Sequence, residues 1–395
     1  MAKINGANQN LKINPLLALG LSAVSVIGVA AFLITLKQNP KLAWAGYLLS
    51  FWYVLALAMM ATVFIAIFSI IKSGWQVVFK RVLEGMSSFL PVAFILSLGI
   101  LFFGVPSLYH WSDAHAVHDA ILVHKSPYLN LPFFIVRTVA FFAIWIGFSR
   151  FFIKNSLQQD LDGKAERTLQ LIPKAALFLI LFALSYSFAS FDYIMAVQPH
   201  WFSTMYGVYM FAGMMGSGLA TLILLLVLVK KLGYLPEVNE NHFHNIAQLL
   251  IGFTIFWMYI WFSQFMLIWY ANIPEETAFF IPRLANGWQW VLGFLILIRW
   301  FFPFVLLLPR PVKRSTKWLV PISILVLCAQ FTDLFYNIFP SVLGLEHGPQ
   351  FPISAILILL GALSFFTLWV LLYLSRVNLI AKNDPFLEES MHLKL

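Results

Sequence analysis

Long apolar runs separated by short polar segments dominate the chain. Ten of these runs reach about 20 residues or more, the length that an α-helix needs to cross the hydrocarbon core of a bilayer. They cover residues 16–36, 43–71, 89–109, 131–153, 172–197, 206–229, 246–271, 288–308, 318–338 and 353–380. The pattern predicts an all-α integral membrane protein with about ten transmembrane helices.

Composition agrees with this class, because 61% of the residues are hydrophobic and only 10% are charged. The single cysteine, Cys328, lies inside a predicted helix. One cysteine excludes internal disulfides, and it excludes an iron–sulphur cluster held by this chain alone, since such a cluster needs four thiolates.

Basic residues fall mostly on one side of the predicted membrane. That side, with the two termini and the loops after helices 2, 4, 6 and 8, holds 19 of the 25 Lys and Arg residues. The opposite loops hold only Lys37, Lys41, Lys125 and Arg283. The positive-inside rule therefore predicts that both termini are cytoplasmic. The net charge of +9 then reflects topology and acidic lipid, and it needs no nucleic-acid partner.

An acidic residue seven positions before a proline occurs twice, as Asp192 to Pro199 and as Asp333 to Pro340. These aspartates fall on predicted helices 5 and 9. The spacing predicts two four-helix bundles, 43–197 (helices 2 to 5) and 206–338 (helices 6 to 9). Because four helices return the chain to the same side, the two bundles form a parallel repeat. Segments 1–36 and 353–395 supply the flanking helices and tails of this single membrane domain.

Ionisable side chains inside the predicted helices are the main candidate site. A charge at membrane depth is costly, so such residues usually face a protein interior and serve proton, ion or ligand chemistry. Arg137 and Asp192 lie at similar depths on adjacent antiparallel helices, which predicts an ion pair. Arg299 and Asp333 offer a looser version in the second bundle. The alternative is that these pairs only hold helices together.

Further polar residues are predicted in the same outer layer: Gln264, Gln330, Asn337, Glu275 and Glu276. Such a layer suits proton exchange with the outer compartment. The cytoplasmic half offers few groups, chiefly Ser69, Thr221 and Thr254, whose hydroxyls are expected to bond their own helix backbones.

The loop after the third helix is rich in titratable residues, including Asp113, His115, His118 and Asp119. Three interpretations compete. The residues can form a zinc site, although a closed site wants four ligands. They can be an ordinary solvated loop. They can accept protons near a reaction site, because the pKa of imidazole is close to neutral.

None of the nine histidines falls at membrane depth on facing helices. A transmembrane b-type haem needs two such imidazoles. A di-haem cytochrome b is therefore disfavoured, and electrons reaching this chain must leave through another subunit.

Two segments resemble signatures of a known family. One runs from Tyr109 and Trp111 through Lys125 to Tyr128, Leu129, Asn130, Pro132, Phe133, Phe134 and Arg137. The other runs from Tyr259 to Glu276, with the sequence YIWFSQFMLIWYANIPEE. With Phe191, Asp192 and Tyr193, they are similar to the large membrane subunits of bacterial alternative complex III, in the polysulphide-reductase membrane-subunit (NrfD-like) family.

This resemblance implies a respiratory quinol:cytochrome c oxidoreductase in the bacterial inner membrane. Iron–sulphur clusters and c-type haems would lie in partner subunits, and a homologous membrane subunit would hold the productive quinol site. A terminal cytochrome oxidase is a further expected partner. This chain would hold no redox cofactor, and it would serve as scaffold and as a candidate proton-conducting element.

Two other functions stay open. The chain can bind quinone itself, in an amphipathic cleft near the outer face with a titratable group beside an apolar wall. It can also be a secondary transporter, because transporters use parallel repeats and buried charges. Its prolines lie mostly at predicted helix ends, so the broken helices typical of transporters are not prominent.

Overall fold

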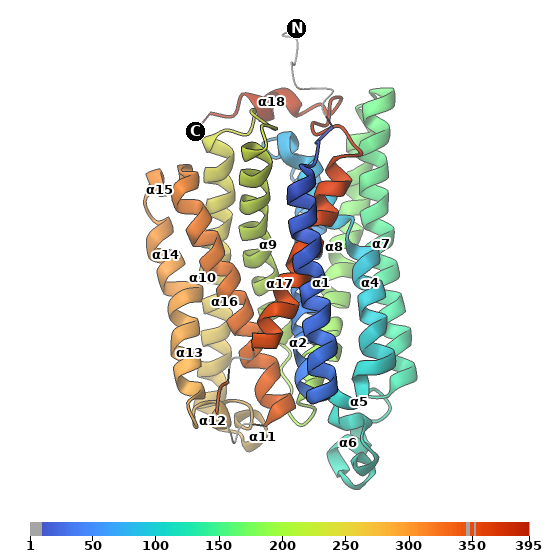
Figure 1. Cartoon of the computed structure of the whole chain (residues 1–395), viewed down its shortest axis with the longest axis vertical. Helices are drawn as coiled ribbons and strands as arrows, with labels where there is room; N and C mark the ends of the chain where they lie inside the picture. Colours follow the sequence, from blue (N-terminus) through green and yellow to red (C-terminus); the bar gives the residue numbers. More distant parts are fainter. Residues whose placement is uncertain (1–9, 345–347, 351–352, 395) are drawn as a thin grey trace.

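The computed structural model describes residues 10–344, 348–350 and 353–394, apart from the side chains of Ala114 and His115. Ten helical spans are long and apolar enough to cross a membrane (Figure 1). This confirms the predicted all-α, multi-pass membrane protein, and the described residues contain no strand. The spans are Pro15–Gln38 (α1), Pro40–Ile70 (α2), Val77–Leu108, Leu131–Asp162 (α7), Glu166–Val197, Tyr206–Lys231 (α9), Glu240–Ala271 (α10), Trp288–Leu307, Thr316–Leu343 (α16) and Ile353–Leu374 (α17).

The remaining elements divide some spans or form the connections. The third span joins η1 (Val77–Phe79), α3 (Lys80–Ser87), α4 (Leu90–Gly99), η2 (Ile100–Gly104) and α5 (Val105–Leu108). The fifth joins α8 (Glu166–Tyr193) and η5 (Met195–Val197), and the eighth joins α13 (Trp288–Ile296), η6 (Leu297–Phe301) and α14 (Phe302–Leu307). The connections contain η3 (His110–Ser112), η4 (Ala114–His118), α6 (Ala120–Lys125), α11 (Pro274–Thr277), α12 (Phe280–Arg283), α15 (Arg310–Arg314) and α18 (Leu387–Met391).

Two spans contain a π-helical turn, η2 and η6, that the sequence analysis did not predict. A proline follows each turn closely, Pro106 in α5 and Pro303 in α14. A proline ring clashes with the carbonyl four residues earlier, and the extra residue of a π turn relieves that clash. For Pro303 the residue four positions earlier is Arg299, so the turn sets where this charged side chain points.

Local signals fix several helix ends at the membrane boundary. Asn14, Asn39 and Asn130 each cap a helix that has a proline in its first turn, and their side chains accept hydrogen bonds from backbone N–H groups. This combination satisfies free N–H groups and pre-sets the helical φ angle. At the other end of α7, Gly163 adopts the left-handed conformation with φ 67° and stops the helix.

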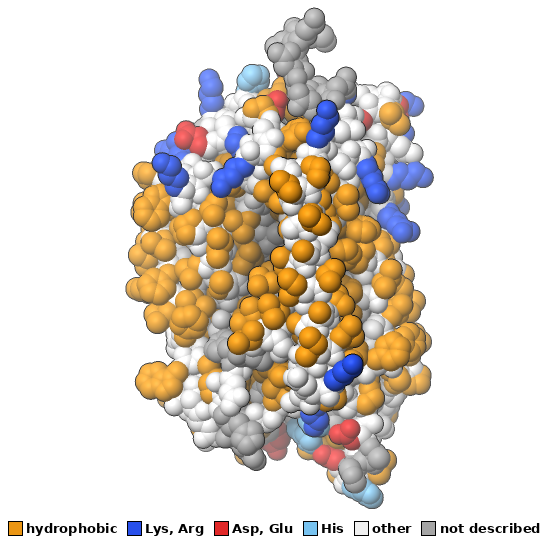
Figure 2. Space-filling view, viewed as in Figure 1, with side chains coloured by type: hydrophobic (Ala, Val, Ile, Leu, Met, Phe, Trp, Pro, Cys, Tyr) orange, Lys and Arg blue, Asp and Glu red, His pale blue; other side chains and the backbone are white. Residues whose placement is uncertain are grey.

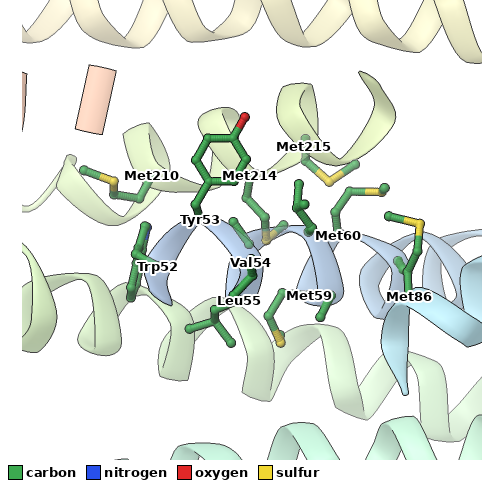
Figure 3. Packing of buried hydrophobic residues seen from close by; sticks show 14 of the residues in the cluster. Trp52, Tyr53, Val54, Leu55, Met59, Met60, Met86, Met210, Met214 and Met215 are labelled. Carbon is green, nitrogen blue, oxygen red and sulfur yellow. The ribbon is translucent and has the colours of Figure 1, made fainter. Parts of the chain in front are cut away.

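The centre of the molecule is formed by α2, α8, α9 and α16. The first helix of each predicted bundle, α2 or α9, packs against the last helix of its own bundle and against the last helix of the other. These two first helices are also the most enclosed spans, with 83% and 89% of their apolar windows buried. Figure 3 shows their contact, where Met60 of α2 lies near Met214 and Met215 of α9. The two halves thus have matching packing partners, as a parallel repeat requires.

The flanking helices α1 and α17 pack against each other at the side of the bundles (Figure 1). Gly28 and Gly361 lie at their crossing, where a Cβ on Gly28 would come within 2.7 Å of the Gly361 Cα. Only glycine permits this approach. The apolar window of α1 is only 6% buried, so the outer face of this helix is left for lipid.

Lys and Arg side chains gather at the end of the molecule where α1 begins and α18 lies (Figure 2). We call this end the basic end. Residues 375–394 lie across it and join the two bundles. Lys80 of the first bundle pairs with Asp384 at 2.8 Å, and His242 Nε2 of the second donates to the Ser390 carbonyl oxygen at 3.0 Å.

Candidate functional site

Arg137 and Asp192 form the predicted ion pair in the first bundle. The Arg137 guanidinium donates from Nε to Asp192 Oδ2 at 2.8 Å and from Nη2 to Oδ1 at 3.0 Å. Arg137 and Asp192 are 8% and 2% exposed. A bidentate pair of this kind gives the strongest geometry that an arginine and a carboxylate can adopt. The shared depth inferred from the sequence is therefore correct for this pair.

Aromatic rings and a carbonyl hold the other side of Arg137. Its guanidinium lies 3.9 Å from the centre of the Tyr128 ring and 4.3 Å from that of Phe133. Nη1 donates to the Tyr128 carbonyl oxygen at 3.0 Å. The Tyr128 hydroxyl interacts electrostatically with Asp192 but makes no hydrogen bond of good geometry. Burial raises the pKa of Tyr128, so its phenol stays neutral.

The position of Asp192 within its helix corrects one expectation. The predicted helix 172–197 runs five residues beyond the aspartate, but α8 ends at Tyr193 and only the short 3₁₀ helix η5 follows. The Tyr193 carbonyl accepts a hydrogen bond from the Tyr109 hydroxyl at 2.9 Å. Asp192 therefore lies in the last turn of α8, where the helix dipole disfavours a carboxylate. The direct contact with Arg137 offsets that cost.

Asp333 in the second bundle has a different environment. Its carboxylate accepts hydrogen bonds from the Tyr209 hydroxyl, from Trp257 Nε1 at 3.1 Å and from Asn337 Nδ2 at 3.2 Å. The Tyr206 hydroxyl extends this network by donating to Asn337 Oδ1 at 3.1 Å. All five residues are at least 95% buried. Asp333 is thus surrounded by neutral donors from α9, α10 and α16.

Arg299 does not contact Asp333 directly. Within the described part of the chain, no carboxylate lies within 4 Å of its guanidinium. It donates long hydrogen bonds to the carbonyl oxygens of Gly213 at 3.3 Å and Val326 at 3.4 Å. It also lies 5.5 Å from the centre of the Trp257 ring, whose indole N–H reaches Asp333. The looser ion pair predicted for these two charges is therefore not formed, and Trp257 contacts both side chains.

The small residues of α9 lie against different neighbours. Small residues in a membrane helix usually allow close packing of a second helix. Packing holds for Gly218, whose Cβ would overlap Met60 of α2. A Cβ on Gly216 would lie 3.4 Å from Arg299 Nη2, and a Cβ on Gly213 would lie 3.1 Å from Gln330 Oε1 and 3.6 Å from Arg299 Nη2. These two glycines therefore lie against the polar side chains of Arg299 and Gln330.

Arg283 is a buried arginine that the sequence analysis placed in an outer loop. It is fully buried at the end of α12. Its guanidinium donates to the carbonyl oxygens of Tyr336 and Phe279 and to the side-chain oxygens of Gln198 and Ser341, at 2.7 to 3.2 Å. Burial lowers the pKa of Arg283 to about 10. Through Gln198 and α16, it ties the two bundles together next to Asn337.

A charged cluster at the basic end was also missed. Arg81 donates to Glu84 Oε2 and to Asp160 Oδ2, both at 2.5 Å, and to Ser156 Oγ at 3.0 Å. The Tyr373 hydroxyl donates to Glu84 at 3.1 Å. The predicted third helix, 89–109, leaves Arg81 in the preceding loop, but the third span begins at Val77 and includes it. The only local signal was the spacing of Arg81 and Glu84, which places them on one helix face.

Buried hydroxyls continue inward from this cluster. The Ser87 hydroxyl lies 2.7 Å from that of Thr62 and 2.6 Å from that of Ser149, so three spans share one hydrogen-bonded chain. The hydroxyls named from the sequence behave as expected. Ser69, Thr221 and Thr254 each donate to the carbonyl four residues earlier in their own helix.

The other predicted outer-layer residues do not converge on either aspartate. Gln330 is buried beside Gly213, and its Oε1 has no hydrogen-bond partner among the described residues. Gln264 is buried on α10, seven residues or about 10 Å beyond Trp257. Glu275 is exposed, and Glu276 contributes only its carbonyl oxygen, which accepts from Trp201. Of this set, Asn337 alone contacts Asp333.

The histidine-containing loop lies beyond the spans at the end opposite the basic end. Asp113 is exposed and pairs with His110 at 3.5 Å, and His118 is exposed. The side chain of His115 lies outside the described residues. No group of three or more His, Cys, Asp or Glu residues that could hold a metal occurs in the described part of the chain. His200 contacts Asp119 at 2.6 Å, and this hydrogen bond holds the pKa of Asp119 below its usual value.

A cleft of about 530 Å³ also opens at the end opposite the basic end, between α2, α13, α16 and α17. Its apolar wall includes Trp288, Phe335 and Phe339, and Asn39 and Gln350 add polar atoms. An apolar wall of this kind is one part of what a quinone cleft needs. A quinone cleft is also expected to have a titratable side chain beside the apolar wall, and the described lining residues include none.

No family model matches this chain. A search of curated proteins finds no match either.

Proposed function

We propose that this chain is a membrane subunit of a respiratory quinol:cytochrome c oxidoreductase of the alternative complex III type. Electrons would travel through iron–sulphur and c-type haem subunits bound to it, and this chain would act as scaffold and proton-conducting element. The proposal rests on the resemblance of residues 109–137 and 259–276 to that family. The basic end would face the bacterial cytoplasm, since Lys and Arg mark the cytoplasmic side.

The observation that carries the proton role is that the first bundle buries ionisable groups near both ends. Arg137 and Asp192 lie near one end, and Arg81, Glu84 and Asp160 lie near the other. The second group has one guanidinium for two carboxylates. The hydroxyls of Ser87, Thr62 and Ser149 would relay protons between this cluster and the interior of the bundle.

Asp333 is the corresponding candidate in the second bundle. Its donors are neutral, and no described cation lies within 4 Å. A carboxylate without a contacting cation can take up or release a proton as nearby charge changes. Quinol oxidation releases protons and changes local charge, so this residue would respond to it.

Quinol binding by this chain itself is the second candidate. The cleft lined by Trp288, Phe335 and Phe339 would suit a quinone ring. Photoaffinity labelling with a quinone analogue should mark these aromatic residues if this candidate holds. Labelling confined to a homologous membrane subunit would leave this chain with the scaffold role.

Two experiments test the main proposal. Affinity purification of the chain from its native membrane should retain subunits with c-type haem absorbance, and recovery of a haem-free single chain that drives solute uptake would identify a transporter instead. In the assembled complex, Glu84→Gln, Asp192→Asn and Asp333→Asn should lower the number of protons released per electron. If all three variants keep the wild-type ratio, the proton role is lost and only the scaffold role remains.

A further inference from the structure

A groove of about 630 Å³ lies on the side of the first bundle, between α4, α7 and α17. Its walls are mostly apolar and include Pro91 of α4, Ile146 and Leu157 of α7, and Trp369 of α17. The hydrogen bond from Trp369 Nε1 to Ser88 Oγ, at 3.0 Å, fixes the indole at its edge. The groove is therefore a built, lipid-facing surface next to the basic end.

Two basic side chains, Arg150 and Lys154, line this groove and have no carboxylate partner among the described residues. Arg150 and Lys154 are one turn apart on α7, and both are exposed. No described carboxylate lies within 4 Å of either, and the lining contains no Asp or Glu. Most other basic residues of the third and fourth spans, such as Arg81 and Arg137, are neutralised by carboxylates. The predicted helix 131–153 ends just before Lys154, but α7 continues to Asp162 and carries it.

The depth of these cations matches a lipid headgroup. Counted from Leu131 at the start of α7, Arg150 lies about 28 Å along the helix and Lys154 about 34 Å. A hydrocarbon core is about 30 Å thick, so the two side chains fall at its far boundary and in the headgroup layer. Trp369 lies about 24 Å from the start of α17, where interfacial tryptophans are common. Ile146 and Pro91 lie deeper, at the level of acyl chains.

We infer that this groove binds an anionic diacyl phospholipid. Arg150 and Lys154 would contact its phosphate, and an acyl chain would lie along Ile146 and Pro91. A soluble anion would gain nothing from the apolar wall. A zwitterionic lipid would bring a second positive charge next to two cations that have no compensating carboxylate. Basic pockets between helices at a membrane surface bind acidic headgroups for this reason.

Native mass spectrometry of the purified full-length chain tests this inference. The chain is titrated with phosphatidylglycerol and with phosphatidylcholine of the same acyl composition. We expect the acidic lipid to be retained preferentially. Removal of one cation should weaken its retention roughly fivefold, and the double variant Arg150→Gln/Lys154→Gln roughly thirtyfold.

Two matched variants separate this site from general attraction. Lys174→Gln/Arg376→Gln removes the same charge from exposed residues at the same end that do not line the groove, and it should leave retention unchanged. Ile146→Trp fills the groove without changing charge, and it should weaken binding.

Three outcomes would overturn the inference. The first is equal retention of the two lipids, and the second is an equal loss of retention in the two double variants. The third is that a quinone of similar tail length displaces the bound acidic lipid, while Arg150→Gln/Lys154→Gln does not change lipid retention. The last result would assign the groove to a quinone.

Discussion

Asp192 and Asp333 hold equivalent places in the two bundles, yet they are stabilised in opposite ways. Asp192 contacts Arg137 through two hydrogen bonds and sits in the last turn of its helix. Asp333 lies well inside α16 and accepts hydrogen bonds only from neutral donors, including Trp257. The Arg299 guanidinium lies over the Trp257 ring and does not contact Asp333. A carboxylate repeated at the same place in two bundles is thus held by a cation in one bundle and by neutral donors in the other.

The surrounding helices explain the difference. In the first bundle, α7 is continuous at Arg137, so the guanidinium stays level with Asp192. In the second, η6 inserts a π turn around Arg299, and the arginine lies in the middle of its span. Its guanidinium therefore meets the carbonyls of Gly213 and Val326 and not the carboxylate of Asp333.

Breaking the first pair should have the largest effect. Arg137→Ala would leave Asp192 buried without its cation, and removal of one partner of a buried pair costs about 3–5 kcal/mol. Thermal unfolding of the purified chain in detergent, followed by tryptophan fluorescence, measures this loss. Lys174→Ala, at an exposed position, is the control and should unfold like the wild type. Equal stability of the two variants would contradict the structural role of the pair.

Removal of Arg283 should come next, because this arginine joins the bundles near Asn337. Arg283→Ala leaves several buried oxygens without donors, for a loss of about 3 kcal/mol. Arg283→Lys should recover part of this, since its ammonium can reach some of the same acceptors. Amine-reactive cross-linking between the bundles, or limited proteolysis at the connection after η5, would report a loosened contact between the bundles. An unchanged digestion pattern in Arg283→Ala would show that Arg283 does not hold the bundles together.

The aspartates themselves allow the sharpest test of the comparison. Asp333→Asn keeps the shape and most hydrogen bonds, so it should cost only about 1 kcal/mol. Asp192→Asn should cost about 3 kcal/mol, because it leaves the Arg137 guanidinium buried without an anion. The measurement is the same unfolding assay applied to both variants. Equal losses would show that the two carboxylates are stabilised alike.

The smallest effect concerns the loop that bears Asp119. The hydrogen bond with His200 holds the pKa of Asp119 below its usual value. The stabilisation that this hydrogen bond gives the loop is therefore fully present above the usual pKa of an aspartate, near 4. It is lost as the pH falls through the lowered pKa of Asp119. Protease sensitivity of residues 110–125 should rise only below about pH 4. Asp119→Asn should remove this pH dependence, and a rise in sensitivity already near pH 6 would point to a histidine instead.

The sequence predicted those parts of the structure that depend on helix length and depth. The ten spans follow from apolar length, and the Arg137 pair follows from two charges at equal depth on neighbouring helices. The contacts of Arg299 could not be predicted in this way, because a π turn changes its position on the helix. The buried cluster of Arg81 and Glu84 could not be predicted either, because charged residues near a helix start resemble a solvated loop. Their burial depends on Asp160 and Tyr373, which are distant in sequence.

The segment that crosses the basic end has a consequence for biosynthesis. Asp384 and Ser390 pair with groups of both bundles, and they follow all ten spans in the chain. Because these residues leave the ribosome last, most of the helices can enter the bilayer while Lys80 and His242 still have no partners from this segment. The final closure of the protein is therefore a post-insertion step, and a premature stop codon after α17 would yield an inserted protein that quality-control proteases can attack from the side where α18 belongs.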